Sequence, residues 1–413
     1  MFTLKFIKQH FPIFNIKQSE NKYFIYLDSA ATSHKPKIVI DSLSIFFKKY
    51  YSNINRGLYK ISGVSNSIYE KARSLTSTFV GSLSSKNIVF TENSTSSLNT
   101  VQRSFMLEKK LFQKKKRIML SVYEHHSNII PWKILSLNTG SKLVYVGTTS
   151  TGFINFKCFV AKLDRRTFLA SLSSCSNTLG LLNKLKKITS LLAKINVISV
   201  IDGSQEVLHG KVSVRSLNCD FYTFSGHKMM SPCGIGVLYI KNKWLGYVMP
   251  TKLGGGVTFN LKLNQKVVLK TPPYVFEGGT PNINGACGLL ASINYLNFLG
   301  YKPLRLQTIK MHFFFKKSIL NVYVKDLVFI PKLSSNYLFH KNPVFLFINN
   351  KHSHDVSHHL NLFNLAIRSG FQCNQPLIEG GLKTHTVSRA SYCMYNCFRC
   401  IRGFILNLKR NNF

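Results

Sequence analysis

Short apolar runs alternate with segments of helical pattern up to about Gly300. The runs at Lys142–Val146, Asn196–Ile201, Asp220–Phe224 and Gly236–Ile240 predict buried strands. Between two of them, Leu182–Ile195 has the pattern of a helix. This alternation is typical of an α/β domain, in which ligands bind at the carboxyl ends of parallel strands.

The pattern of residue types along the chain changes after about Gly300. Basic and aromatic segments such as Met311–Lys317 come first, and extended stretches follow. We therefore predict a domain boundary near residue 300, with a larger domain before it and a smaller one after it.

The charge of the chain is strongly unbalanced. Its 413 residues include 55 Lys and Arg against 15 Asp and Glu, a formal net charge of +40, while a hydrophobic content of 45% excludes wholesale disorder. A polybasic surface for nucleic acid or anionic lipid is one interpretation. Compositional drift is the other, because Lys, Asn, Ile, Phe and Tyr share A/T-rich codons. Basic residues are scattered, with short runs such as 114–117, so we favour drift and predict no specific nucleic-acid partner.

The cysteines and the N-terminal sequence bear on the compartment. Nine cysteines in a chain without an apolar leader segment predict free thiols in a reducing compartment. No stretch approaches the roughly 18 uninterrupted apolar residues of a membrane span, so no membrane association is expected. We expect a protein that is not secreted and works in a bacterial cytoplasm or a plastid-type organelle.

Two neighbouring strand ends carry the most informative chemistry. The strand before Asp202 ends in a carboxylate and a glycine turn, which taken alone is an ordinary turn cap. The next strand ends in Ser225, Gly226 and His227, directly before Lys228, which taken alone is one lysine among many. Together, a carboxylate and a lysine are what pyridoxal phosphate needs, because the acid keeps the pyridine nitrogen protonated and the amine holds the aldehyde carbon as an imine.

These two stretches resemble the motifs of fold-type I pyridoxal phosphate enzymes, specifically the class V aminotransferase and cysteine desulfurase group. The resemblance covers roughly residues 10 to 400, and the SUF-type (SufS-like) cysteine desulfurases are the most similar. Further matches occur in the expected order at Tyr26–Thr32, Asn55–Gly57, Val89–Thr91, Glu124–Asn128, Ser176–Gly180, Phe276–Asn282 and Arg389–Ser391.

The resemblance implies a fold with a large and a small domain. The large domain, residues 21–300, would carry a mostly parallel seven-stranded sheet around the cofactor. The smaller α+β domain, residues 301–413, would present a nucleophilic cysteine loop, and residues 1–20 would pack with it.

The resemblance also implies how the cofactor is held. Lys228 would be the Schiff-base lysine and the proton shuttle, Asp202 would pair with the pyridinium, and His125 would stack on the ring. Gln205 and Asn177 would flank the ring hydroxyl and the substrate. The expected phosphate anchors are Thr95, Ser225, His227 and, from a second subunit, Thr280.

Further residues would bind substrate and carry the reaction. Arg389 would bind the substrate α-carboxylate, with Ala30, Asn177 and Arg368 beside it. Cys373 lies in a segment that resembles the Arg-x-Gly-x-x-Cys loop of the family. It would take the γ-sulfur of L-cysteine as a persulfide and leave alanine, and the cation of Arg368 would lower the pKa of its thiol.

The chain departs from the family beside this cysteine. Phe371-Gln372 stands where relatives commonly have His-His, and Asn55 stands where they often have His. The loss of a possible proton relay puts the rate in question rather than the type of reaction.

Two other clusters, one of cysteines and one of histidines, contain residue types that bind metal ions. Cys393, Cys397 and Cys400 have no convincing fourth ligand, His385 being the nearest, so we favour packing. The histidine-rich stretch His352–His359 is better explained as the cap of a helix with solvent-facing side chains. We predict no metal site.

The leading hypothesis is a homodimeric, pyridoxal phosphate-dependent L-cysteine desulfurase that passes sulfur to a SufE- or SufU-like acceptor and then to an Fe–S scaffold. Two alternatives stay open. One is a selenocysteine lyase or another lyase or aminotransferase on the same scaffold. The other is a catalytically decayed basic binding protein, against which the joint retention of Asp202, Lys228, Cys373 and Arg389 speaks.

Overall fold

The computed structural model describes residues 4–15, 24–107, 116–262, 264, 266–320, 327–330 and 341–410. The expected limit between residues 20 and 21 lies outside these ranges, as do the first two residues of the basic run at 114–117. Within the described ranges, no helix is both long and apolar enough to cross a membrane.

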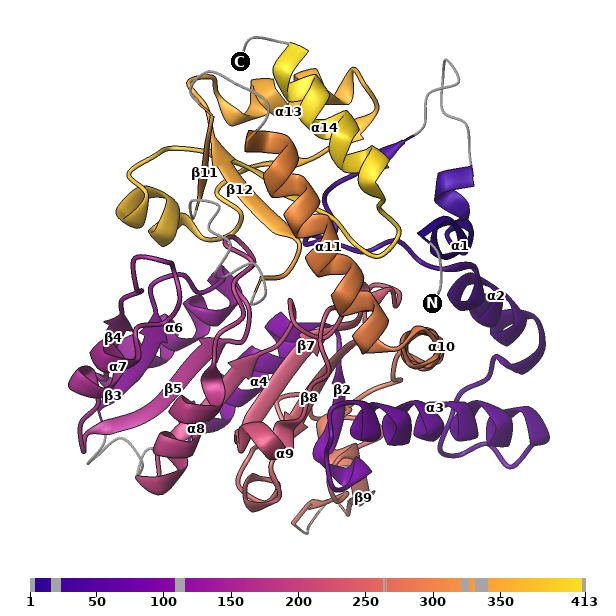
Figure 1. The fold of residues 1–413 in the computed structure, drawn as a ribbon. Coiled ribbons are helices and arrows are strands. Elements are labelled where there is room, and N and C mark those ends of the chain that lie inside the picture. The colour runs from indigo at the N-terminus through magenta and orange to yellow at the C-terminus, as the bar shows by residue number, and fades with distance from the viewer. Residues whose placement is uncertain are drawn as a thin grey trace.

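A seven-stranded, mostly parallel sheet forms the centre of the larger part of the molecule (Figure 1). Its strands, in the order β2-β8-β7-β6-β5-β3-β4, are β2 (Ile88–Thr91), β8 (Gly236–Ile240), β7 (Phe221–Ser225), β6 (Ile198–Asp202), β5 (Thr167–Ser173), β3 (Arg117–Ser121) and β4 (Lys142–Val146). Strand β8 runs opposite to the other six strands. The four strands predicted from the sequence are confirmed as β4, β6, β7 and β8. Every residue of β5 to β8 is buried, as expected for strands covered on both faces.

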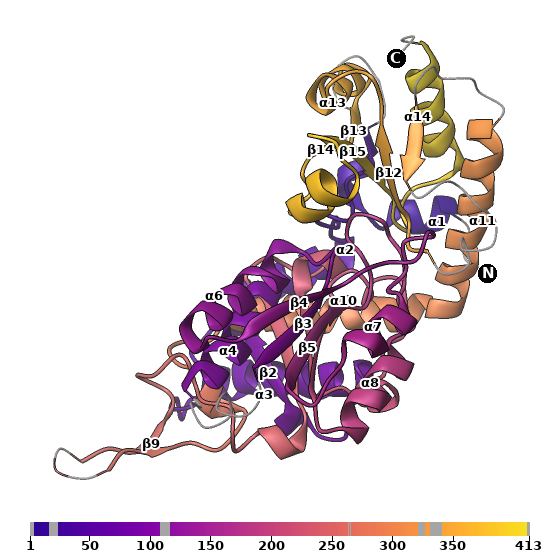
Figure 2. The ribbon, with the colours of Figure 1, turned by 90° about the vertical axis from the view of Figure 1, so that its left-hand side faces the viewer.

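Helices cover both faces of this sheet and form two separate apolar cores (Figure 2). One face packs against α4 (Ser94–Leu107) and α6 (Ile130–Thr139). The other packs against α3 (Lys60–Phe79), α7 (Phe156–Lys162), α8 (Leu185–Lys194) and α10 (Ile283–Leu299). The predicted helix at 182–195 is confirmed as α8. The remaining helices of this part are α2 (Lys37–Ile45) and α9 (Val214–Leu217).

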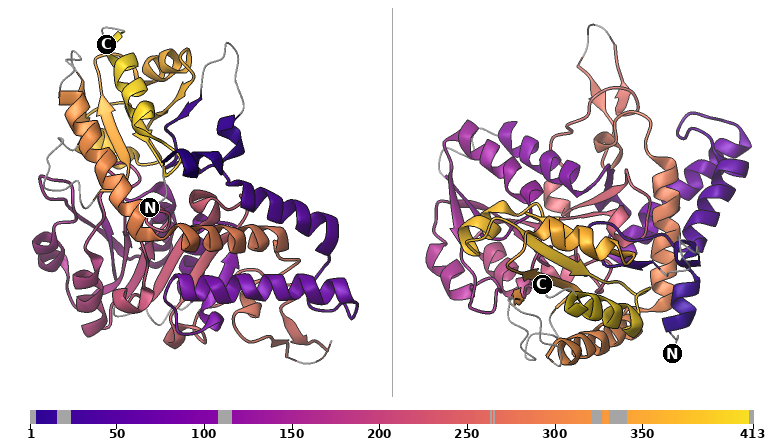
Figure 3. Two further views of the ribbon diagram at one scale, coloured as in Figure 1. Left: turned by 45° about the vertical axis from the view of Figure 1, so that its right-hand side comes forward. Right: turned by 90° about the horizontal axis from the view of Figure 1, so that it is seen from above.

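The C-terminal part contains a smaller, antiparallel sheet with its own apolar core (Figure 1). Its strands, in the order β11-β12-β15-β14, are β11 (Val328–Ile330), β12 (Val344–Ile348), β15 (Val387–Ser391) and β14 (Arg368–Gly370). Its helices are α11 (Tyr301–Leu320), α13 (Ser353–Asn361) and α14 (Phe398–Arg410). The α13 helix begins with His352 as its N-cap, which fits the predicted cap. Elsewhere, β9 (Thr258–Asn260) and β10 (Val268–Leu269) form a hairpin that projects from the body of the molecule (Figure 3).

The N-terminal chain lies beside this C-terminal part. Strand β1 (Ile25–Tyr26) pairs in parallel with β13 (Leu365–Ala366), so the pairing continues past the residue 20 limit implied by the resemblance. Before β1 come α1 (Leu4–Gln9) and a short turn. The ring centroids of Phe11, in this segment, and Tyr395 are 4.8 Å apart. Phe11 also lies 6.1 Å from Tyr295 of α10, so this segment contacts both parts of the molecule. The domain limits themselves stay a prediction.

A buried ion pair joins α3 to the segment that leads to Thr280. The Arg73 guanidinium, only 1% exposed, donates to Glu277 at 2.6 and 2.8 Å. The same carboxylate accepts hydrogen bonds from the Phe90 N–H at 2.7 Å and the Tyr69 hydroxyl at 2.8 Å. Helix α3, strand β2 and the segment before Thr280 are therefore joined through one charged contact.

We expect Glu277→Gln to lower the free energy of unfolding by about 3–5 kcal/mol, because it removes the buried carboxylate and leaves the buried Arg73 charge with only the more exposed Glu70 as its partner. The shift in the urea midpoint, followed by circular dichroism, measures this loss. As a control, Asp41→Asn breaks the exposed pair with Lys37 and is expected to cost no more than about 1 kcal/mol. Equal shifts for the two variants would contradict a structural role for the buried pair.

Candidate active site

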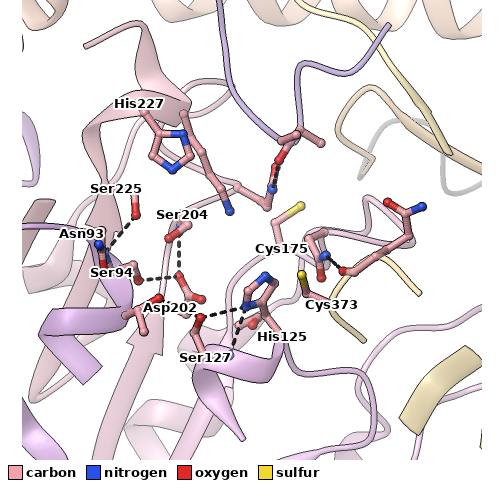
Figure 4. Close-up of a pocket in the computed structure, with 18 of the residues that line it drawn as sticks. Asn93, Ser94, His125, Ser127, Cys175, Asp202, Ser204, Ser225, His227 and Cys373 are labelled. Atoms are coloured by element: carbon pink, nitrogen blue, oxygen red, sulfur yellow. Dashed lines mark hydrogen bonds between the residues drawn. The ribbon is translucent and has the colours of Figure 1, made fainter. Parts of the chain in front are cut away.

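A cavity of about 380 Å³ lies at the carboxyl ends of β5, β6 and β7, where the C-terminal part meets the main sheet (Figure 4). It is lined by twelve of the predicted site residues: Ala30, Thr95, His125, Asn177, Asp202, Gln205, Ser225, His227, Lys228, Arg368, Cys373 and Arg389. Thr280 does not line it. Thr280 lies in an adjoining cavity of about 210 Å³, and Glu92 and Gly234 line both.

The Asp202 carboxylate ends β6 at the floor of the cavity. Its Oδ1 accepts from the Ser204 N–H at 3.0 Å and from the Ser94 hydroxyl at 3.3 Å. Both hydrogen bonds that the described residues donate to this carboxylate fall on Oδ1, which leaves Oδ2 for a ligand. The sequence assigned no role to Ser94 or Ser204. The Ser204 contact follows a familiar pattern, an aspartate bonded to the N–H two residues on, whereas nothing in the sequence indicates the Ser94 contact.

One end of the cavity suits an anion. Helix α4 begins at Ser94, whose N–H donates to the Ser225 hydroxyl at 2.9 Å, and Thr95 is the next residue. The Thr95 hydroxyl lies 2.8 Å from that of Ser127. Free N–H groups and the helix dipole at such a terminus stabilise negative charge. His227 lies on the same side of the cavity as Ser225 (Figure 4). Burial and the neighbouring lysines lower the pKa of His227 to about 4, so its ring is neutral at pH 7.

Lys228 follows β7 in the tight turn Gly226–Met229. A Cβ on Gly226 would lie 2.7 Å from Ile235 Cγ2, so the turn packs closely only because this residue is glycine. Burial lowers the pKa of Lys228, Asp202 opposes this shift, and Arg389 adds to it. A larger neutral fraction makes the amine a better nucleophile toward a carbonyl carbon.

His125 presents a neutral ring to the cavity. Burial, and then the charge of Lys228, lowers the pKa of His125 to about 4. The Ser127 N–H donates to its Nδ1 at 3.1 Å, so the proton of the neutral ring lies on Nε2. The preceding Glu124 is fully buried and accepts from Asn128 Nδ2 at 2.8 Å and from the Ser173 N–H at 3.0 Å, which fixes this turn against β5.

Arg389 lies on β15 and is only 2% exposed. Its Nη2 donates to Asp28 Oδ1 at 3.0 Å, and its Nη1 donates to the Asn177 carbonyl at 3.0 Å. Its Nε has no hydrogen-bond partner among the described residues. Arg368 lies 3.9 Å from the other oxygen of Asp28. Asp28 belongs to the Tyr26–Thr32 motif, but no role was predicted for it. Its partners, Arg368 and Arg389, are more than 300 residues away in the sequence, so their contact could not be predicted from local patterns.

The Cys373 loop follows β14 and adopts a left-handed backbone. Gln372 and Cys373 both have φ of +54°. The Gln372 carbonyl accepts from Asn177 Nδ2 at 2.7 Å, and the Cys373 carbonyl accepts from the His126 N–H at 2.9 Å. Asn374 Nδ2 donates to the Tyr123 carbonyl at 2.8 Å. These contacts fix the loop against the segments that follow β3 and β5 at the carboxyl ends of the main sheet.

Two further cysteines line the same cavity, and the sequence singled out neither. Cys175 is buried, and burial raises the pKa of its thiol. Cys233 is exposed. Figure 4 shows Cys175 and Cys373 on the side of the cavity that also carries His125. Among the described residues, no group of three metal-binding side chains gathers, and the cluster at 393–400 makes none.

Comparison with known proteins places this arrangement in a family. The chain belongs to the class V aminotransferases, whose family pattern it matches over residues 25–403. It is 35% identical to a protein of Borreliella burgdorferi named as a probable cysteine desulfurase, over 98% of this chain and 96% of that one. Among solved structures, it is similar to the apo cysteine desulfurase of Thermococcus onnurineus, with a TM-score of 0.91 and 29% identity over 99% and 98% of the two chains. It also resembles the cysteine desulfurase CsdA of Escherichia coli, with a TM-score of 0.88 and 25% identity over the same shares.

Enzymes of this family depend on pyridoxal phosphate, and the residues of the cavity fit that group. The free Oδ2 of Asp202 suits a protonated pyridine nitrogen, and the neutral ring of His125 suits stacking. The start of α4 suits a phosphate dianion. The buried hydroxyl of Ser204 has no hydrogen-bond partner within the described part of the chain, so it is available to a polar group of a ligand. Lys228 would hold the cofactor covalently.

Replacing Lys228 with alanine is expected to abolish the visible absorbance of covalently attached pyridoxal phosphate, because no other lysine lines the cavity within the described ranges. Absorbance spectra of the purified variants measure this directly. Lys241→Ala, which changes a lysine just after β8, should keep the wild-type spectrum. A wild-type-like spectrum from the Lys228 variant would overturn the assignment.

Proposed function

We propose that this protein is a SUF-type L-cysteine desulfurase that uses pyridoxal phosphate and transfers sulfur to Cys373. The observation that carries the proposal is the fixed Cys373 loop, which brings a thiol into the cavity that also holds Lys228, Asp202 and Arg389. The reaction is balanced: L-cysteine and the Cys373 thiol give L-alanine and the Cys373 persulfide. The gathering of these side chains in one cavity argues against a catalytically decayed binding protein.

Arg389 binds the substrate carboxylate in this proposal. Asp28 and the Asn177 carbonyl hold one N–H of each terminal nitrogen, so the guanidinium is oriented before substrate arrives. Its remaining N–H groups, including the unpartnered Nε, suit a carboxylate, which accepts two parallel hydrogen bonds from such a fork. The substrate is thereby selected as an α-amino acid.

Lys228 holds and moves the proton at the substrate Cα. The cofactor, when bound, withdraws electrons from the substrate carbons so that this proton becomes acidic. The depressed pKa of Lys228 favours the free amine that accepts it. The Ser204 N–H and the Ser94 hydroxyl fix the Asp202 carboxylate, which would pair with the ring nitrogen of the cofactor and keep it protonated.

Cys373 attacks the substrate sulfur. The C–S bond of the substrate breaks, the sulfur stays on Cys373, and the carbon takes up a proton to become the methyl group of alanine. A thiolate is the reacting species. Arg368 lines the same cavity and supplies positive charge there.

The assembly, the partner and the compartment belong to the same proposal. A homodimer would place Thr280 of a second subunit at the phosphate, and Thr280 borders a cavity that adjoins the active site. The half-buried Cys373 would pass sulfur to a SufE- or SufU-like acceptor, and an acidic docking face would suit the net charge of +40. Nine free cysteines support a reducing compartment, such as a bacterial cytoplasm or a plastid-type organelle.

Changing Cys373 to serine should reduce alanine formation from L-cysteine to below about one thousandth of the wild-type rate, because the group that accepts sulfur is lost. The cofactor absorbance should remain, which shows that the site is intact. The matched control is Cys158→Ser on α7, outside the cavity, which should keep full activity. Alanine formation at the wild-type rate by the Cys373 variant would disprove the assigned nucleophile.

An Arg389→Lys variant is expected to lose about 10- to 150-fold in kcat/KM for L-cysteine. The lysine ammonium keeps the positive charge but cannot form the two parallel hydrogen bonds that a guanidinium makes with a carboxylate. Steady-state kinetics measure the loss, which should fall mainly on KM. Arg166→Lys, at an exposed position, serves as the control. An unchanged KM for the Arg389 variant would show that another group binds the carboxylate.

A further inference from the structure

A second thiol site lies away from the active-site cavity, at the start of α14. Cys397 directly precedes this helix and Cys400 lies in its first turn, in a Cys-x-x-Cys sequence. Their sulfur atoms are 3.5 Å apart. Neither residue lines the cavity that holds Cys373. The desulfurase chemistry therefore leaves this pair unexplained.

The two thiols have different environments. Cys397 is half-buried and is followed by the exposed Phe398 and Arg399, whereas Cys400 is only 5% exposed. An outer, accessible sulfur thus lies against an inner, protected one. This is the arrangement in which one thiol attacks a partner molecule and the other completes the exchange.

The electrostatics favour a thiolate at the outer position. Hydrogen bonds from the Cys400 thiol and from the N–H groups of Cys400 and Arg399, together with the charge of Lys8 on α1, lower the pKa of Cys397 to about 5. The pKa of Cys400 is raised by the same contact and by burial. Helix N-termini and Cys-x-x-Cys pairs stabilise thiolates in this way in disulfide-exchanging proteins.

We propose that Cys397 and Cys400 form a redox-active dithiol that exchanges with small disulfides, independently of Cys373. The Cys397 thiolate attacks one sulfur of a low-molecular-weight disulfide, the S–S bond of that disulfide breaks, and one thiol leaves. Cys400 then gives up its proton and attacks the Cys397 sulfur, which releases the second thiol. Two protein thiols are oxidised to one disulfide while the small disulfide is reduced to two thiols.

The surrounding chain fixes the pair for this reaction. The Cys400 N–H donates to the Cys397 carbonyl at 2.9 Å. The preceding Asn396 is buried, accepts from the Cys393 N–H at 2.7 Å and donates to the Tyr26 carbonyl at 3.0 Å. Since the backbone on both sides is already ordered, closing the disulfide costs little conformational entropy.

Thiol trapping and mass spectrometry test the pair in the full-length holoenzyme. The protein is equilibrated with mixtures of reduced and oxidised glutathione, quenched with iodoacetamide and digested. We expect the peptide that contains Cys397 and Cys400 to lose two hydrogens and escape alkylation as the mixture becomes more oxidising. In Cys400→Ser, glutathione should remain attached to Cys397, and in Cys397→Ser, Cys400 should stay unmodified.

Two results would overturn the proposal. One is a Cys397–Cys400 peptide that stays reduced while the exposed Cys233 acquires glutathione under the same conditions. The other is a pH profile of Cys397 alkylation with a midpoint at the ordinary thiol value of about 8.5. We expect the Cys397 midpoint to lie several pH units lower, because the thiolate is already present there. Both readouts follow thiol mass and reactivity, so they do not depend on desulfurase activity.

Discussion

The active site depends on the hydrogen bonds that fix the Cys373 loop against the segments that follow β3 and β5 of the main sheet. Gln372 and Cys373 both adopt the left-handed conformation, which costs roughly 1–2 kcal/mol for each residue. Backbone and amide hydrogen bonds to Asn177, His126 and Tyr123 contribute about 0.5–1.5 kcal/mol each, which is of the same order. The loop therefore keeps its strained shape only while both parts of the molecule stay in contact. That contact brings the Cys373 thiol into the cavity at the carboxyl ends of the main sheet.

Carboxylates are scarce in this chain, and several of those in or near the site hold another group in place. Asp202, at the end of β6, accepts two hydrogen bonds, and Asp28 orients Arg389. Glu124 fixes the turn that carries His125. Glu277 secures the segment before Thr280 through Arg73. The net charge of +40 thus reflects the surface and general composition, while the interior retains the few acids that the site needs.

Local patterns in the sequence predicted four strands of the main sheet, whereas the resemblance to the family supplied most residues of the cavity. Strands β4 and β8 have the predicted bounds, and Asp202 and Lys228 meet because both follow parallel strands that are neighbours in the sheet. Contacts between distant segments could not be predicted in this way. Asp28 meets Arg389 across 361 positions, and β1 pairs with β13. The sulfur contact of Cys397 and Cys400 follows from helix geometry, but the sequence alone favoured packing for this cluster.

In the proposed reaction, Cys373 receives the substrate sulfur. The most direct measurement is the mass of the Cys373 peptide after the holoenzyme has turned over L-cysteine without a sulfur acceptor. We expect one additional sulfur atom on that peptide, removable by a reducing thiol, and none on the peptides that carry Cys175 or Cys233. Alanine release without added sulfur on Cys373, or with the sulfur on either of the other two cysteines, would contradict it.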